Sequence, residues 1–174
     1  VIESRGLGDV YKRQASLLVE SIIPKRTRED DKRALKVGLE RTAKMGWTQL
    51  HDAGSPLSDF NLLKEIYDEE GLPIRIQMYI SDGEDAIKFI ETGPFLDPNH
   101  FLTSRGVKLY ADGAIGSRGA AFFEKYDDYE TKGLIIFQKE KTMPKLIKSL
   151  VNGIQIQTCC LLYTSDAADD DVRV

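Results

Sequence analysis

Residues 72–93, LPIRIQMYISDGEDAIKFIETG, contain a strand followed directly by a helix. Apolar and polar side chains alternate from Ile74 to Ile80, which is the period of a β-strand with one buried face. A helix is predicted from Gly83 to Thr92, and a loop rich in proline, glycine and asparagine follows through His100. A strand and then a helix is the repeating unit of α/β folds with a parallel sheet.

The sequence before this unit predicts a helix, a short strand and a second helix. The first helix begins near Thr27, because Thr27 and Asp30 approximate a capping box, and Gly46 is placed to end it. Trp47 to about His51 is predicted to be the strand. Ser58 is the candidate N-cap of the second helix.

The sequence after the unit predicts a strand at 107–110, an amphipathic helix at 139–152 and a strand at 154–158. Strands and helices thus alternate four times along the chain, which predicts βαβ units on a parallel sheet. Periodicity alone does not choose between a small doubly wound sheet and an arc cut from a barrel.

The composition is that of one ordinary soluble domain. The chain has 174 residues, of which 41% are hydrophobic and 30% charged, and its net charge is −4. It is too short for a complete (β/α)8 barrel, which needs about 250 residues. The charge and composition exclude disorder, a polybasic nucleic-acid surface and a membrane protein. A cytoplasmic location is favoured because no apolar stretch near the start resembles a signal peptide, and the oligomeric state cannot be inferred.

Both ends of the chain resemble translated sequencing adapter. Residues 4–14, SRGLGDVYKRQ, match a transposon-derived library adapter, and residues 160–170, CLLYTSDAADD, match its opposite strand. Natural polar tails are the alternative. We therefore divide the chain into adapter at 1–14, a biological insert at 15–158 and adapter at 159–174, and we exclude the two ends from the fold.

Lys108 is unusual because it lies inside the predicted strand at 107–110, between positions that should be buried. Lysine is almost never fully buried unless paired, and burial favours the neutral amine. One interpretation is structural: the side chain points to a polar face or pairs with Asp112. The other is chemical: the neutral amine reacts with carbon dioxide, and the resulting carbamate bridges two metal ions.

The glycine-rich segment GAIGSRGA, residues 113–120, has two interpretations. Its backbone amides can surround an anion, or it can form a tight structural turn. Arg118 can clamp a carboxylate or phosphate, although a lone loop arginine is commonly a solvated charge. Asp112 can carry a proton or cap the turn. His51 follows a predicted strand, where parallel α/β folds collect their functional groups.

Two segments resemble one branch of a known superfamily. GVKLYADGAIGSRGAAFFEKYDD, residues 106–128, closely resembles the signature of the YtcJ-like branch of the amidohydrolase superfamily, and GWTQLHDAG, residues 46–54, resembles the strand before it. The branch includes N-substituted formamide deformylase and proteins labelled as exoenzyme regulatory proteins. The resemblance implies an α/β fold that is part of a (β/α)8 barrel with parallel strands, lacking the first and last barrel units.

The resemblance also implies an activity, which is metal-dependent hydrolysis of a carbon–nitrogen bond in a small non-peptide amide. By this analogy Lys108 is the carboxylated metal-bridging lysine and Asp112 is a catalytic residue. His51, Ser117 and Arg118 would bind substrate at the mouth of the site. The implied cofactor of the full-length parent is a divalent metal, with zinc expected, whose bound water attacks the carbonyl.

The departures from the branch limit what this chain can do. The HxH metal pair of its first strand and its later metal ligands are not found here, and Cys159 stands near the position of one histidine. We therefore expect the chain neither to bind metal tightly nor to catalyse, and its unpaired sheet edges to favour aggregation. The alternative function is a non-catalytic α/β regulatory or anion-binding module that uses the glycine-rich loop at 113–119, and neither function involves nucleic acid or a membrane.

Sequencing the source DNA outward from the insert tests both expectations. The reading frame should continue beyond Ala15 and Thr158 in place of the adapter, with an HxH pair upstream and a histidine downstream. Continuation of the present end sequences in genomic DNA would show natural tails, and flanks without those ligands would favour the binding module.

Overall fold

A computed structural model describes Val19 and residues 22–162 of the chain. The chain divides into two compact units. One contains residues 25–109 and 143–157, and we call it the sheet unit; the other, the loop unit, contains residues 110–142 and the described residues before 25 and from 158 onward. The adapter predicted at 1–14 lies outside the described residues, and that predicted at 159–174 lies inside them only as far as Leu162.

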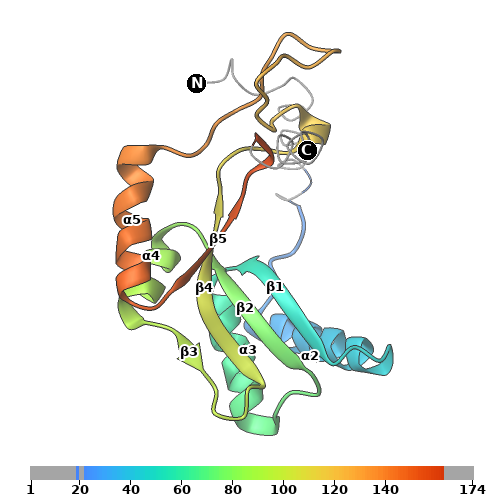
Figure 1. The fold of residues 1–174 in the computed structure, drawn as a ribbon. Helices are drawn as coiled ribbons and strands as arrows, with labels where there is room; N and C mark the ends of the chain where they lie inside the picture. Colours follow the sequence, from blue (N-terminus) through green and yellow to red (C-terminus); the bar gives the residue numbers. More distant parts are fainter. Residues whose placement is uncertain (1–18, 20–21, 163–174) are drawn as a thin grey trace, which may run out of the picture. The chain divides into compact units, whose positions relative to one another are not determined.

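The sheet unit is built on a sheet whose strands follow the order β1-β2-β4-β3, with β5 also paired to β4 (Figure 1). The strands are β1 (Gln49–Ser55), β2 (Arg75–Ser81), β3 (Phe95–Leu96), β4 (Leu102–Tyr110) and β5 (Gln155–Cys159). β1 and β4 both pair with β2 in parallel, whereas the two-residue β3 is antiparallel to β4. The predicted α/β fold with a parallel sheet is confirmed.

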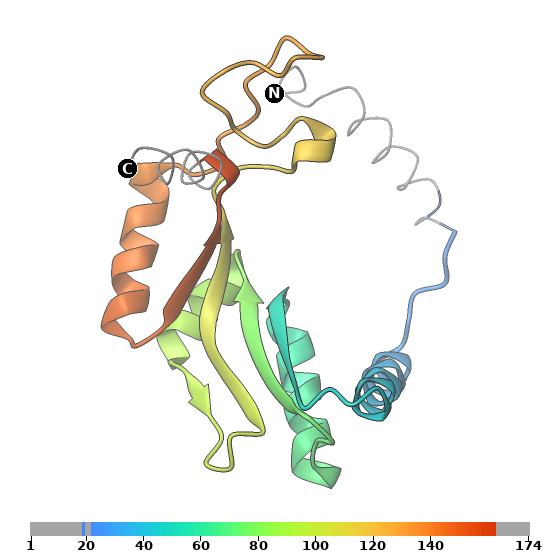
Figure 2. The same ribbon diagram turned by 45° about the vertical axis from the view of Figure 1, so that its right-hand side comes forward.

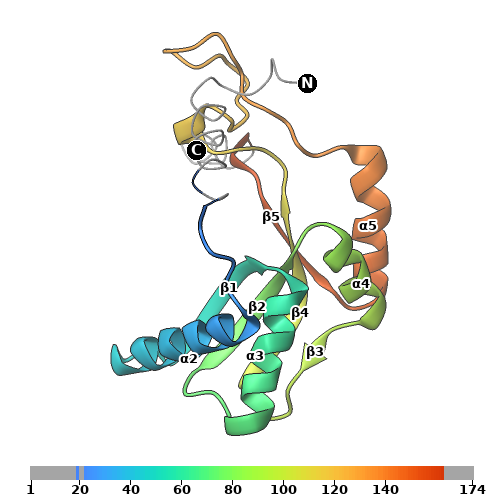
Figure 3. The ribbon, with the colours of Figure 1, turned by 180° about the vertical axis from the view of Figure 1, so that it is seen from behind.

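Within the described residues, four α-helices accompany the strands. They are α2 (Arg28–Lys44), α3 (Leu57–Glu70), α4 (Glu84–Thr92) and α5 (Lys139–Val151). Figure 3 shows α3 and α4 on one face of the sheet, and Figure 2 shows β5 along β4 with α5 beside it. Within the described part of the chain, no helix has the length and apolar composition that crossing a bilayer requires.

The helix ends show where the sequence was informative. The capping box of α2 is confirmed, since Thr27 and Asp30 each accept the other's backbone N–H with their side chains. The predicted N-cap of α3 is wrong: Pro56 occupies that position and Ser58 lies inside the first turn. Proline has no side-chain acceptor for a cap, and the Asp85 carboxylate of α4 accepts the N–H of Leu57 in place of a local cap.

Two strands differ from their predicted bounds. β1 begins at Gln49 and continues through the predicted loop to Ser55, and β4 begins at Leu102, well before the predicted Val107. The pairing of β2 with β4 shifts register between Met78 and Tyr79, where Arg105 is an extra residue on β4. Such a bulge breaks the alternation that sequence analysis depends on, and it therefore hid the first half of β4.

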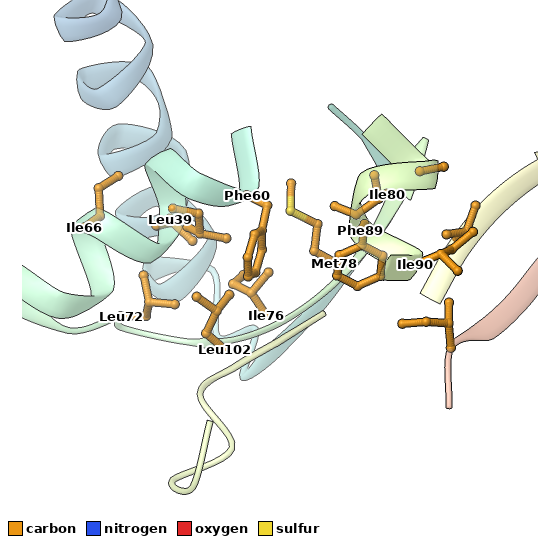
Figure 4. Close-up of a cluster of buried hydrophobic side chains, with 14 of the residues drawn as sticks. Leu39, Phe60, Ile66, Leu72, Ile76, Met78, Ile80, Phe89, Ile90 and Leu102 are labelled. Carbon is orange, nitrogen blue, oxygen red and sulfur yellow. The ribbon is translucent and has the colours of Figure 1, made fainter. Parts of the chain in front are cut away.

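The hydrophobic core lies between the sheet and its helices (Figure 4). Ile76, Met78 and Ile80 of β2 and Val107 and Leu109 of β4 all belong to it. The helices and connections contribute further buried side chains, among them Leu39, Phe60, Leu63, Ile66, Leu72, Phe89 and Ile90. Each large apolar side chain buried in this way contributes about 1.5–3 kcal/mol. The core thus fixes which face of each strand is turned to the helices.

An ion-pair cluster joins α2 to α3. The ammonium group of Lys32 lies 2.7 Å from carboxylate oxygens of both Glu65 and Glu69, and Arg28 also pairs with Glu65. The hydrogen bonds to Arg28 and Lys32 lower the pKa of Glu65 to about 2. The hydrogen bonds that Lys32 donates to Glu65 and Glu69 raise the pKa of Lys32 to about 12. The cluster therefore requires Glu65 to be ionised.

Glu65→Gln should lower the thermal unfolding midpoint at neutral pH, because it removes the anion that both cations share. The folded-state pKa of Glu65 is about 2, below its ordinary value of 4.5, so its stabilising contribution is present above pH 4.5 and is lost as the pH falls towards 2. The difference between the unfolding midpoints of the wild-type chain and Glu65→Gln should therefore disappear as the pH falls from 4.5 towards 2. Glu40→Gln, at an exposed position of α2, is the control and should show no such gap; a gap independent of pH would contradict the assignment.

Candidate active site

The face of the sheet opposite α3 and α4 carries polar side chains. Successive side chains of a strand point to opposite faces. Because Ile76, Met78 and Ile80 pack in the core, Gln77, Tyr79 and Ser81 of β2 lie on the other face. Val107 and Leu109 place Lys108 of β4 on this same face.

Lys108 lies where β1, β2 and β4 approach their carboxyl ends. It is paired in register with Ser81, and only 9% of its surface is exposed. A Cβ atom added to Gly54 of β1 would lie 3.1 Å from both Cβ and Cγ of Lys108 and 3.3 Å from Oγ of Ser81. The aliphatic stem of the lysine is therefore packed against the β1 backbone. The predicted burial of Lys108, which made this lysine a candidate site residue, is confirmed.

His51 is on the same sheet but not at the same level. It pairs in register with Gln77, whereas Lys108 pairs with Ser81, four residues further along β2. At 3.3 Å per residue this separates the two levels by about 13 Å. His51 is exposed, and its Nε2 lies 3.0 Å from Nε2 of Gln49. The structure does not bring His51 beside Lys108.

A set of hydrogen-bonded polar side chains, which the sequence did not predict, crosses this face. The hydroxyl of Tyr79 on β2 donates to Oε1 of Gln155 on β5 at 3.1 Å and accepts from Nε2 of Gln77 at 3.0 Å. β4 lies between β2 and β5, and a Cβ on its Gly106 would lie 2.3 Å from two carbons of the Tyr79 ring. A glycine inside a strand signals such a close approach, so Gly106 was the available clue.

Asp112, in the loop unit, is a buried carboxylate with an exposed fraction of 3%. It accepts the backbone N–H of Ala121 at 3.3 Å, of Leu162 at 3.0 Å and of Leu161 at 2.9–3.0 Å to its two oxygens. These contacts match the structural interpretation of Asp112, in which it holds a turn. Leu161 and Leu162 fall in the predicted adapter, but any residue except proline supplies the same N–H groups.

The glycine-rich loop is closed on itself. The N–H of Gly113 donates to the carbonyl of Gly119, and those of Gly119 and Ala120 both donate to the carbonyl of Ala114, all at 2.9–3.1 Å. The hydroxyl of Ser117 also donates to Ala114, at 3.2 Å. Amides engaged in this way are not available to surround an anion, so the contacts favour the tight structural turn.

Arg118 has its own partners in the loop unit. Its Nε and Nη2 donate to the two oxygens of Asp128 at 3.1 and 2.7 Å, and its guanidinium lies 5.3 Å from the centre of the Tyr129 ring. The same hydrogen bonds lower the pKa of Asp128. An arginine paired with a carboxylate and an aromatic ring must break these contacts before it can clamp a substrate.

Two cavities lie near these residues. One of about 900 Å³ is lined by α2, β1 and α3 and includes His51 and Asp52. The other, of about 450 Å³, lies in the loop unit, with Asp112, Phe137 and Cys160 among its lining residues. In the described residues, no three His, Cys, Asp or Glu side chains are grouped so as to hold a metal ion.

Comparison with known proteins adds a family and a fold. The pattern of the amidohydrolase family matches residues 5–173, which includes both end segments as well as the insert. None of the curated proteins compared with the chain matches it.

Two solved structures share the fold. An uncharacterized metal-dependent hydrolase from Pyrococcus horikoshii OT3 is 24% identical with a TM-score of 0.67, over 78% of this chain and 28% of that one. One from Pyrococcus furiosus is 23% identical with a TM-score of 0.67, over 86% and 31%. The chain thus spans less than a third of either hydrolase.

Gly106→Ala should destabilise the chain by about 1–3 kcal/mol, because the added methyl group overpacks the Tyr79 ring. The matched control is Gly38→Ala on α2, where an added Cβ has no neighbour within 4 Å. That change should be neutral or stabilise by about 0.5–1 kcal/mol, since alanine is the better helix former. Urea unfolding measures both, and equal midpoints for the two variants would refute the close approach.

Proposed function

The chain belongs to the amidohydrolase family, and on that premise we propose that it is an internal part of a metal-dependent enzyme of the YtcJ-like branch. The parent protein would hydrolyse a carbon–nitrogen bond in a small non-peptide amide. The lysine-strand signature, which coincides with β4 and the loop after it, supports the branch. The likeness to two metal-dependent hydrolases, of which the chain spans less than a third, supports the barrel fragment.

The observation that carries the proposal is the position of Lys108. Lys108 is only 9% exposed, and it lies on the polar face of a parallel sheet, near the carboxyl ends of three strands and outside the hydrophobic core. Its nitrogen would form a bond to the carbon of carbon dioxide and release one proton to solvent, which leaves a carbamate anion.

The described residues alone do not complete a metal site. Among the described residues of the sheet's polar face, Lys108 is a candidate ligand near the carboxyl ends of the strands, and His51 lies about four residues away along the sheet. We therefore derive no catalytic step from this chain, and we propose that the remaining ligands, with zinc as the expected metal, belong to the rest of the barrel. Asp112 and Ser117 would shape the loop beside the strand end, with Asp112 as the residue to test for a catalytic role.

The outer edge of β1 indicates where the rest of the barrel would attach. In the described residues β1 pairs with β2 alone, and the cavity of about 900 Å³ opens beside it between α2 and α3. A closed barrel has no free edge. We propose that a preceding barrel strand pairs there in the parent.

Metal analysis of the purified chain tests the proposal. After incubation with zinc and dialysis against a chelator, the chain should retain far less than one zinc per molecule, whereas the full-length parent should retain stoichiometric zinc. Lys108→Ala in the parent should weaken zinc binding by roughly tenfold or more. Stoichiometric zinc in the isolated chain, or a parent whose zinc binding is unchanged by Lys108→Ala, would contradict it.

A further inference from the structure

We propose that a bulge in β1, from Asp52 to Ser55, positions the side chain of Lys108, and that Gly54 is the residue on which this depends. The proposal rests on the proposed function only in taking Lys108 as the site lysine. Asp52 and Gly54 are positioning residues here, because both act through Lys108.

The bulge is a break in the pairing of β1 with β2. The register is regular from Gln49 opposite Arg75 to Asp52 opposite Met78, and the next pair is Ser55 opposite Ile80. β1 therefore advances by three residues while β2 advances by two. One extra residue on one strand bends that strand and redirects its backbone.

The side chain of Asp52 holds the bulge in place. Its Oδ1 accepts the backbone N–H of Gly54 at 3.1 Å, and its Oδ2 accepts the hydroxyl of Ser55 at 2.8 Å. Gly54 has a φ of +143°, a conformation that L side chains rarely adopt. The bulge therefore depends on an acceptor oxygen in the side chain at 52 and a glycine at 54.

The redirected backbone forms one side of the Lys108 position. An added Cβ at Gly54 would lie 3.1 Å from Cβ and Cγ of Lys108, closer than the 3.5–4.0 Å of an ordinary carbon–carbon contact. Oγ of Ser81, the register partner of Lys108, lies 3.3 Å from the same point. Gly54 thus lets the lysine stem lie flat against β1, and any side chain at 54 displaces it.

Restraint of the Lys108 side chain would lower the entropy cost of its reaction with a fixed partner. A free lysine side chain samples many rotamers, and ordering it costs up to about 2 kcal/mol. A group that must meet a fixed partner has to be held within about 0.5 Å. The bulge restricts the lysine in the folded chain before any partner binds.

Chemical labelling of Lys108 in the full 174-residue chain tests the inference without metal or carbon dioxide. Acetylation by an N-hydroxysuccinimide ester is followed by mass spectrometry of the peptide that contains Lys108. Gly54→Ala should raise the Lys108 labelling rate by about threefold or more, since the added Cβ forces the lysine stem to shift away from β1.

Gly83→Ala is the matched control. Gly83 has a φ of +133°, close to that of Gly54, but an added Cβ there has no neighbour within 4 Å. Both variants therefore have the same kind of backbone strain, and only one of them touches Lys108. The Lys108 rate should stay at the wild-type value in Gly83→Ala.

A second pair of variants addresses Asp52. Asp52→Ala removes both acceptors and should raise Lys108 labelling as Gly54→Ala does. Asp52→Asn keeps an oxygen for the Gly54 N–H and should restore the wild-type rate.

Two results would overturn the inference. One is a Lys108 rate that stays unchanged in both Gly54→Ala and Asp52→Ala. The other is an equal rise at Lys32, whose side chain is 12% exposed in the α2–α3 ion-pair cluster, because it would mean that Gly54 serves the fold as a whole. A parent without zinc at Lys108 would refute the proposed function and leave the labelling result standing.

Discussion

The two-residue alternation of β2 and β4 constrains everything else in the sheet unit. The helices take the apolar side chains, Ile76, Met78 and Ile80 on one strand and Val107 and Leu109 on its neighbour. The side chains between them must then lie on the other face, and they include Tyr79 and Lys108. A face with these polar side chains suits the interior of a barrel, where several strands contribute groups to one site.

Two glycines determine how the large side chains on that face are arranged. Gly106 on β4 leaves room for the Tyr79 ring to reach Gln155 on β5, and Gly54 on β1 leaves room for the stem of Lys108. Gly106 lies on the strand next to that of Tyr79, whereas Gly54 lies on β1, which β2 separates from the strand of Lys108. The lack of a side chain at Gly54 and Gly106 therefore shapes this face as much as the side chains of the other residues do.

Local signals in the sequence predicted the helices and strands. Features that depend on contacts between residues distant in sequence were not predicted. Thr27 and Asp30 predicted the start of α2 because a capping box is contained within one turn. Ser58 was a wrong N-cap because Asp85, distant in sequence, serves the start of α3. Burial of Lys108 followed from the strand period, whereas its close approach to Gly54 depends on a bulge in β1, two strands away. The partners of Arg118 and Asp112 were likewise out of reach, since they lie nine or more residues away along the chain.

A crystal structure of the full-length parent, with anomalous scattering recorded at the zinc edge, tests the central claim most directly. The account predicts a further strand paired in parallel with the outer edge of β1 and an anomalous peak at the end of the Lys108 side chain. An outer edge of β1 that remains unpaired, or zinc bound at a site that Lys108 does not reach, would contradict it.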